Sequence, residues 1–325
     1  MLVLLIAAVA FVVLRAGREG TPGGGDLKVT VQPGWSASRI ASELQRAGVI
    51  DSVLAFRAYL KLQGVDSDFR SGEYTMRKKM GFSELVEVLK SGPEIDYVKL
   101  TIPEGLTVEQ TAARVERVTH VSAEEFLGAA TPSTVRPKTL PDGINSLEGF
   151  LYPQTYFIIE LDTAQVIVER LVGEFEKRTA SVDFGKASSF GLTPFQVLVI
   201  ASMIEEEAKV DEERAKVAAV IYNRIERKMK LEIDATVQYA VRKYDGEPLT
   251  EQDIAVDSPY NTRRYAGLPP GPISSPRLES IQAALNPAET EDLFYVLSPD
   301  CRHHTFTETY EEFLREKQQL PDCSR

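Results

Sequence analysis

Residues 193–209 read TPFQVLVIASMIEEEAK, which is the pattern of a capped helix with an acidic end. The first residue suits a helix N-cap, Pro194 suits the first helical position, and Gln196 can close a capping box. The run 197–204 is apolar on every side apart from one serine, so we expect this helix to be buried. Glutamates 205–207 therefore end a buried helix and not a solvated one.

The acidic helix end is a candidate for acid chemistry. Glu207 follows three apolar residues at helical spacing, and Glu205 follows two. A carboxyl group on an apolar face loses hydration, which raises its pKa toward the range that a general acid needs at neutral pH. A solvated acidic helix end is the alternative. A metal site is less favoured, because the glutamates point around the helix and no histidine stands at ligand spacing, so we expect no metal and no other cofactor.

Composition excludes several classes of protein. The chain has 325 residues, a formal net charge of −11 and 43% apolar residues, which is ordinary globular composition and not that of a disordered, collagenous or multi-span membrane protein. The acidic balance argues against nucleic-acid binding, which needs clustered Lys and Arg. The sequence lacks a P-loop, a GxGxxG turn and paired CxxC motifs.

The N-terminus indicates a membrane anchor. Residues 1–14 read MLVLLIAAVAFVVL without a charge, which is shorter than the about 20 residues of a spanning helix. No basic stretch precedes them and no A-x-A site follows, so we expect a truncated transmembrane anchor; a buried core helix is the alternative. Residues 15–26 have the glycine-rich composition of a flexible linker. The body is then expected outside the cytoplasm, where Cys301 and Cys323 either pair or stay free.

The next segment predicts a small α+β module. A strand, turn and helix pattern occurs at 29–44 and again at 100–115, with Ser36 and Thr107 as expected N-caps. Between the two patterns the sequence predicts helices over 53–62 and 82–91 and a strand over 72–76. We therefore divide the chain into a module at 27–97 and a mixed, helix-rich domain at 98–325, with α+β as the fold class.

Several polar motifs follow the acidic helix. A second helix is expected over about 211–229, and a rigid loop at 267–273, GLPPGPI, cannot be helix or central strand. Such a loop fixes backbone groups in space. The aromatic cluster 147–156, LEGFLYPQTY, is typical of core, with a ligand groove as the alternative.

The order of these motifs resembles a known family. LEGFLYPQTY, ASMIEEEA, YNR, DATVQY, YNT, GLPPGPI and HTF, spread over about 29–313, are similar to the endolytic murein transglycosylases of the MltG (YceG-like) type. The resemblance implies a single N-terminal membrane helix in the inner or plasma membrane, a LysM-like module at 27–97, and a catalytic domain at 98–325 outside the cytoplasm. It also implies peptidoglycan glycan strands as the substrate.

The resemblance also implies site residues. Glu207, the last of the E-x-E pair, takes the place of the catalytic acid, with Glu205 as the supporting or alternative acid. The sequence departs from the family pattern at Glu206, where a basic residue is common, at Ala208, where Thr or Ser is common, and at Arg263, to which we assign no substrate role. The candidates for substrate contact are Tyr222, Asn223, Asp234, Thr236, Gln238, Tyr260, Asn261, Thr262, Gly267, Leu268, Pro269, Pro270 and His304.

The implied reaction cleaves the MurNAc–GlcNAc β-1,4 bond without water and leaves a 1,6-anhydro-MurNAc end. A hydrolytic muramidase with Asp234 as second carboxylate is one alternative. A non-catalytic, membrane-anchored glycan-binding module is another. Docking of residues 27–97 to cell-wall synthases or to division or elongation proteins is compatible with either activity.

Overall fold

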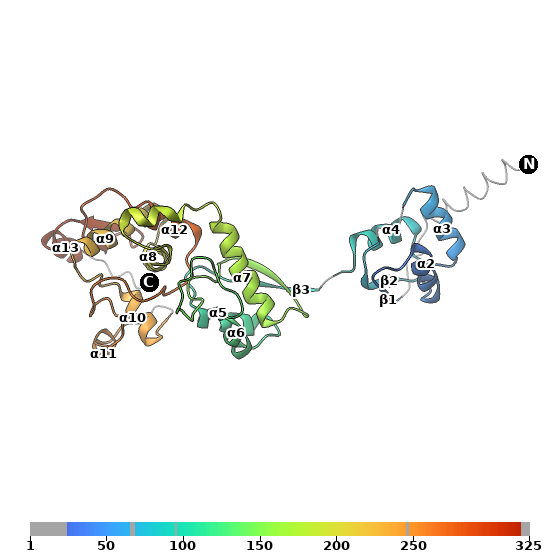
Figure 1. The fold of residues 1–325 in the computed structure, drawn as a ribbon, viewed down its shortest axis with the longest axis horizontal. Helices are drawn as coiled ribbons and strands as arrows, with labels where there is room; N and C mark the ends of the chain where they lie inside the picture. The colour runs from blue at the N-terminus through green and yellow to red at the C-terminus, as the bar shows by residue number, and fades with distance from the viewer. Residues whose placement is uncertain (1–24, 66–68, 95, 245–246, 320–325) are drawn as a thin grey trace, which may run out of the picture. The chain divides into compact units, whose positions relative to one another are not determined.

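The computed structural model describes residues 25–65, 69–94, 96–244 and 247–319 (Figure 1). The anchor expected at 1–14 and most of the linker at 15–26 lie outside these residues, as does Cys323 of the cysteine pair considered above. The chain divides into two compact units between Asp96 and Tyr97, each with its own hydrophobic core. The α+β class is confirmed, with many helices and three two-stranded antiparallel sheets in the described part.

The N-terminal unit consists of strand β1 (Asp26–Val31), helices α2 (Ala37–Arg46) and α3 (Val53–Leu62), strand β2 (Gly72–Arg77) and helix α4 (Phe82–Ser91). The two helices predicted after the first strand–turn–helix pattern have the predicted bounds, and the predicted strand is one residue longer.

Residues that alternate between inward and outward positions on β1 and β2 build the core of this unit. Val29 and Val31 on β1 and Tyr74 and Met76 on β2 point inward, and Val29 pairs with Tyr74 across the sheet. The helices cover this face with apolar stripes that include Leu44 of α2.

The C-terminal unit begins with β3 (Tyr97–Thr101), which pairs with β4 (Thr155–Ile159). Between and after these strands lie α5 (Val108–Val118), α6 (Ala123–Ala129) and α7 (Ala164–Thr179). Next come the 3₁₀ helix η1 (Phe184–Phe190), α8 (Pro194–Glu207), the 3₁₀ turn η2 (Asp211–Glu213), α9 (Arg214–Glu226), α10 (Asp234–Val241), α11 (Glu251–Ile254), α12 (Leu278–Leu285), β5 (Phe294–Leu297), β6 (His304–Thr307) and α13 (Tyr310–Lys317).

The helix predicted over 211–229 is shorter than expected. Its first turn is η2, and α9 ends at Glu226. Lys228 then takes a positive φ of 54°, and the backbone N–H of Met229 donates to the carbonyl of Arg224, so the chain reverses there.

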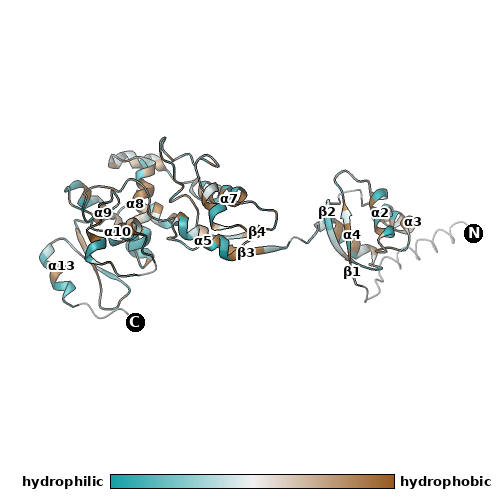
Figure 2. Ribbon diagram, turned by 90° about the horizontal axis from the view of Figure 1, so that it is seen from below, coloured by the Kyte–Doolittle hydropathy of each residue, from teal (hydrophilic) through white to brown (hydrophobic). Residues whose placement is uncertain are grey.

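Helix α8 is the centre of the C-terminal unit. Thr193 and Gln196 form the predicted capping box, and the residues from Val197 to Glu205 are all buried. Helices α9, α10, α12 and η1 pack around it, and its hydrophobic residues are brown in Figure 2. In the ranges that the structure describes, no single helix has the length and hydropathy of a membrane span; η1 and α8 meet that test only as a pair bent by 89°.

The aromatic cluster 147–156 belongs to the core, as predicted, and its loop also carries a buried carboxyl group. Glu148 accepts hydrogen bonds from the backbone N–H of Val108, at 3.1 and 3.3 Å, and from the Tyr239 hydroxyl at 3.2 Å. It thereby caps α5, whose N-terminal N–H groups lack helical partners. Burial raises the pKa of Glu148 to about 8.

A close contact joins this loop to the proline-rich loop. Gly149 has a φ of +86°, and a Cβ at this position would lie 2.8 Å from Pro272. Only glycine satisfies both conditions, so the contact fixes the 267–273 loop beside α8.

We expect Glu148 to make stability depend on pH. Between its ordinary pKa of 4.5 and about 8, the folded protein keeps a proton that the unfolded chain releases. The free energy of unfolding therefore falls as pH rises through this window, by at most about 1.4 kcal/mol per pH unit. Glu148→Gln should flatten the decline of Tm between pH 5 and 8, as measured by thermal melts. The exposed Glu124→Gln is the control, and parallel melting curves for wild type and Glu148→Gln would contradict the assignment.

Candidate active site

The three glutamates at the end of α8 lie in three different environments. Successive helical residues point about 100° apart, so Glu205 is buried, Glu206 is exposed and Glu207 is half-buried. The prediction that the acidic end leaves a buried helix is confirmed, and the chemistry of each carboxylate follows from its neighbours.

Glu205 is held in a buried ion-pair network. One oxygen, Oε2, accepts from the backbone N–H of Arg277 and from the Ser280 hydroxyl, both at 2.9 Å. The other, Oε1, lies 3.0 Å from the Arg277 Nε and 3.3 Å from a guanidinium nitrogen of Arg214. Both oxygens are therefore engaged in joining α8 to α9 and α12, which favours a structural role over that of an alternative acid.

Glu207 has the environment of a general acid. The Tyr295 hydroxyl on β5 donates to its Oε2 at 2.8 Å, and Oε1 receives no hydrogen bond from any described residue. Burial raises the pKa of Glu207, the Tyr295 hydrogen bond opposes this rise, and the nearby charge of Asp234 adds to it. The raised pKa favours the protonated form of Glu207, and Oε1 is the oxygen without a hydrogen bond from a described residue.

Charged side chains surround Glu207. His304 on β6 has its Nδ1 at 2.7 Å from Glu213, and its ring lies 5.5 Å from that of Tyr295. Arg263 forms an ion pair with Asp234. His304 and Arg263 both oppose the rise in the pKa of Glu207. The structure therefore brings together Glu207, Asp234 and His304 of the predicted site.

Asn261, Thr262 and Thr236 are buried and position this charged group. The Asn261 amide donates to the carbonyls of Ile254 and Val256, both at 2.9 Å, and its oxygen accepts from the backbone of Arg263. Thr262 joins the Thr236 hydroxyl at 2.9 Å. These bonds hold the start of α10, which carries Asp234, against the segment that carries Arg263.

Tyr222 and Asn223 on α9 are bonded to other backbone segments. The Tyr222 hydroxyl donates to the carbonyl of Ala284 at 2.8 Å. The Asn223 amide donates to the carbonyls of Thr290 and Asp292, at 2.8 and 2.9 Å. Asn223 thus fixes the segment that leads into β5, and through it Tyr295. Their polar atoms are used inside the protein, which favours positioning over substrate contact.

The proline-rich loop packs along α8. The backbone N–H of Ile273 donates to the Ser202 hydroxyl at 3.0 Å. Gly267 has a φ of +91°, Leu268 is half-buried, Pro269 is buried and Pro270 is exposed. The loop leaves only part of its surface open to a ligand.

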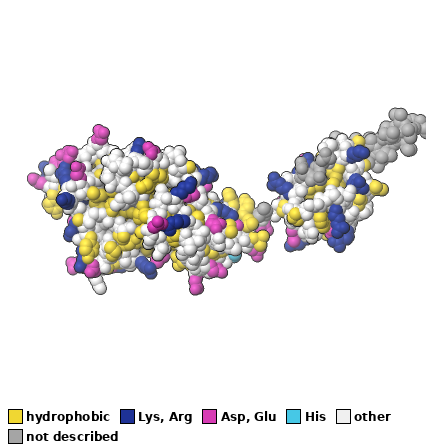
Figure 3. Space-filling model, in the orientation of Figure 1, with side chains coloured by type: hydrophobic (Ala, Val, Ile, Leu, Met, Phe, Trp, Pro, Cys, Tyr) yellow, Lys and Arg dark blue, Asp and Glu magenta, His cyan; other side chains and the backbone are white. Residues whose placement is uncertain are grey.

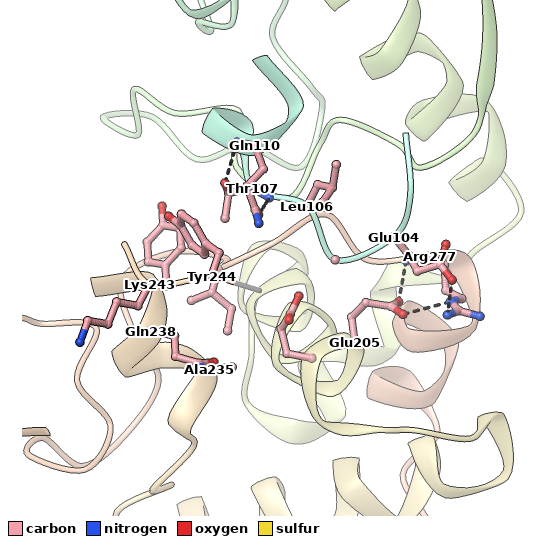
Figure 4. Close-up of a pocket in the computed structure, with 14 residues that line it drawn as sticks. Glu104, Leu106, Thr107, Gln110, Glu205, Ala235, Gln238, Lys243, Tyr244 and Arg277 are labelled. Atoms are coloured by element: carbon pink, nitrogen blue, oxygen red, sulfur yellow. Dashed lines mark hydrogen bonds and ion pairs between the residues drawn. The ribbon is translucent and has the colours of Figure 1, made fainter. Parts of the chain in front are cut away.

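A pocket of about 390 Å³ lies beside Glu206 (Figure 4). Glu104, Glu205 and Arg277 come together on one side of it, and Lys243 and Tyr244 lie on the opposite side. Gln238 also lines it, and the Tyr239 ring packs 4.8 Å from that of Tyr260. Across the ranges with described coordinates, no three His, Cys, Asp or Glu side chains are grouped to hold a metal ion.

Sequence reasoning missed Tyr295, Glu213 and Arg277, and gave Arg263 no role. Tyr295 sits in a short apolar strand, FYVL, and nothing in that strand marks it as functional. The E-x-E spacing alone could not separate a paired Glu205 from a free Glu207, because each follows apolar residues.

Known proteins resemble the chain over most of its length. The model of the YceG-like family matches residues 29–319. An endolytic murein transglycosylase of Bacillus subtilis is 33% identical over 308 residues, covering 90% of this chain and 84% of the relative. One of Streptococcus pneumoniae is 30% identical and covers 82% of this chain, which spans only 53% of that relative's length.

A solved structure is also similar to this chain. The crystal structure of a yceG-like protein from Listeria monocytogenes matches with a TM-score of 0.60 at 28% identity, covering 89% of this chain and 98% of that one. The family match extends across both units and includes every residue of the Glu207 site. The chain belongs to the YceG-like family.

Proposed function

We propose that the chain is an endolytic lytic transglycosylase of peptidoglycan. The observation that carries this proposal is Glu207, a single carboxyl group with a raised pKa, one oxygen held by Tyr295 and the other free. The relatives named endolytic murein transglycosylases support the substrate class.

The proposed reaction uses one carboxyl group in two steps. Glu207 donates its proton to the glycosidic oxygen as the bond to C1 of MurNAc breaks, which releases the GlcNAc-containing part. The carboxylate then removes the proton from the C6 hydroxyl of the same MurNAc, whose oxygen bonds to C1. Water is not consumed, and Glu207 ends protonated again.

A hydrolytic reaction would need a second carboxylate to activate water. Asp234 is the nearest candidate, but it is exposed and paired with Arg263. That ion pair favours an electrostatic effect of Asp234 on Glu207 over activation of water. The mass of the product distinguishes the two reactions, since an anhydro end is lighter by one water.

We also propose roles for the remainder of the chain. Residues 1–14 anchor it in the membrane, with both units outside the cytoplasm, which rests on their apolar run. The N-terminal unit is a LysM-like glycan-binding module, which is supported by a groove that contains Trp35, with Arg39 5.2 Å from its ring. Lys and Arg side chains outnumber Asp and Glu on the face of this unit in Figure 3. Docking to cell-wall synthases or division and elongation proteins is compatible with this surface.

Two substitutions on α8 should separate catalysis from structure. Glu207→Gln should lower formation of anhydro-MurNAc ends by at least about 100-fold with little change in Tm, because it removes a general acid. Glu205→Gln should lower the free energy of unfolding by about 3 kcal/mol, because it removes the buried carboxylate that lies between the guanidinium groups of Arg214 and Arg277. Mass spectrometry of glycan digests and thermal melts measure the two effects.

The outcomes have distinct meanings. Activity retained in Glu207→Gln would reject the proposed acid. Reducing ends in place of anhydro ends would indicate a muramidase, and Asp234 would be tested next. Strands that bind without being cleaved by wild type would indicate a non-catalytic module.

Tyr295→Phe should change the pH profile of cleavage. The tyrosine hydrogen bond favours ionised Glu207, so its removal raises the pKa of Glu207 further and shifts the alkaline limb of the kcat profile to higher pH. The rate at neutral pH should fall, by up to about 100-fold if the carboxyl group loses its orientation. The exposed Tyr310→Phe is the matched control, and an alkaline limb that stays in place would contradict the coupling.

The membrane and module proposals have a joint test. The full chain should sediment with membranes after an alkaline wash, and Trp35→Ala should reduce its retention on insoluble murein several-fold without changing the membrane fraction. A full chain found in the soluble fraction would reject the anchor, and unchanged retention would reject the groove.

A further inference from the structure

The pocket beside Glu206 adjoins the proposed catalytic acid. Glu206 and Glu207 are neighbours on the last turn of α8, and Ala235, which lines the pocket, follows Asp234, whose charge acts on Glu207. Glu207 itself does not line the pocket, so the part of a glycan strand that enters it lies beyond the reacting sugar.

Both cations that line the pocket already have partners. Arg277 pairs with Glu104 at 2.7 Å and with Glu205 at 3.0 Å. Lys243 pairs with Asp253 at 2.6 Å. Neither is available to an anionic ligand without the loss of an existing ion pair.

Glu206 is the carboxyl group of the pocket that has no cationic partner among the described residues. It is exposed, and no Lys, Arg or His among the described residues lies within salt-bridge distance of it. Partial desolvation raises the pKa of Glu206 to about 7, the charges of Glu205 and Glu207 add to this rise, and Ser274 opposes it. A cation in the pocket would stabilise the ionised form of Glu206 against desolvation and against the nearby negative charges.

The loop at Gly105 lies close to the Glu206 carboxylate. Gly105 has a φ of +77°, and a Cβ there would lie 2.9 Å from the Glu206 Oε1. The backbone N–H of Gly105 donates to the carbonyl of Ser275 at 3.1 Å, which holds the loop. The carboxylate therefore lies between this loop and the pocket, whose lining includes Tyr239 and Tyr244.

From this charge balance we propose that the pocket binds the protonated side-chain amine of a peptide stem carried by the glycan strand. The inference rests on the proposed function, because it takes murein as the substrate. An ammonium group donates to the Glu206 carboxylate, and tyrosine rings favour a cation nearby. Neutral sugar hydroxyls would leave the Glu206 charge uncompensated.

Cross-linking removes the positive charge of the stem amine. When a stem amine is acylated in a cross-link, it becomes a neutral amide and can no longer pair with a carboxylate. The pocket therefore selects strands whose stems carry free amines, which are strands not yet fully joined to the wall.

The test compares two forms of one substrate. Strands with free stem amines and the same strands after N-acetylation are titrated into Glu207→Gln protein, which binds without turnover, and Kd is measured by calorimetry. Acetylation should weaken binding about tenfold. Adding Glu206→Gln should abolish the difference, and adding Glu226→Gln, an exposed carboxylate outside the pocket, should retain it.

Each outcome decides the proposal independently of catalysis. Equal Kd values for the two forms overturn the amine assignment, whether or not wild type cleaves the strands. A difference that persists in the Glu206→Gln protein also overturns it, since another group then reads the amine. Failure of wild type to produce anhydro ends, with the Kd difference intact, would reject the proposed reaction but not the pocket. Unchanged melts confirm that the variants fold.

Discussion

The ion pairs of the buried Glu205 carboxylate with Arg214 and Arg277 hold the end of α8, on which the candidate site is built. Removing these charges from water is costly, and their attraction offsets that cost only when the geometry is good and the remaining donors are satisfied. Here Ser280, Arg214 and the Arg277 backbone complete the network. The result is a fixed end for α8, from which Glu206 and Glu207 leave in set directions.

One helix turn thus presents three carboxylates with three tasks. Glu205 has cationic partners. Glu206 has partial desolvation, like charges and a hydrogen bond with Ser274. Glu207 lies among Tyr295, His304 and Arg263. Chemical identity is the same in all three, so their different behaviour comes entirely from the surroundings. This explains how a strongly acidic segment can contain both a structural ion pair and the proposed proton donor.

Local rules predicted much of the fold. The capping residues Thr193 and Thr107 and the apolar faces of α2, α4 and α8 depend on neighbours within a few positions. The role of Asn223 was not predictable in this way, because helical spacing identifies a face but not what packs on it. Tyr295 and Arg277 contact α8 from positions 88 and 72 residues away in the sequence. A single sequence does not indicate which residues meet over such separations.

The long sequence separation between Glu207 and Tyr295 also affects the stage of folding at which the candidate site is complete. The acid on α8 acquires its tyrosine partner, 88 residues later, only when the chain has been made to β5 and that strand has docked. Loop closure over such lengths is slow compared with helix formation. During synthesis, the α8 segment is therefore made before its partners, and the proposed catalytic centre is complete only after β5 has been made and has docked. An incompletely folded copy carries the acid but lacks the groups that tune it.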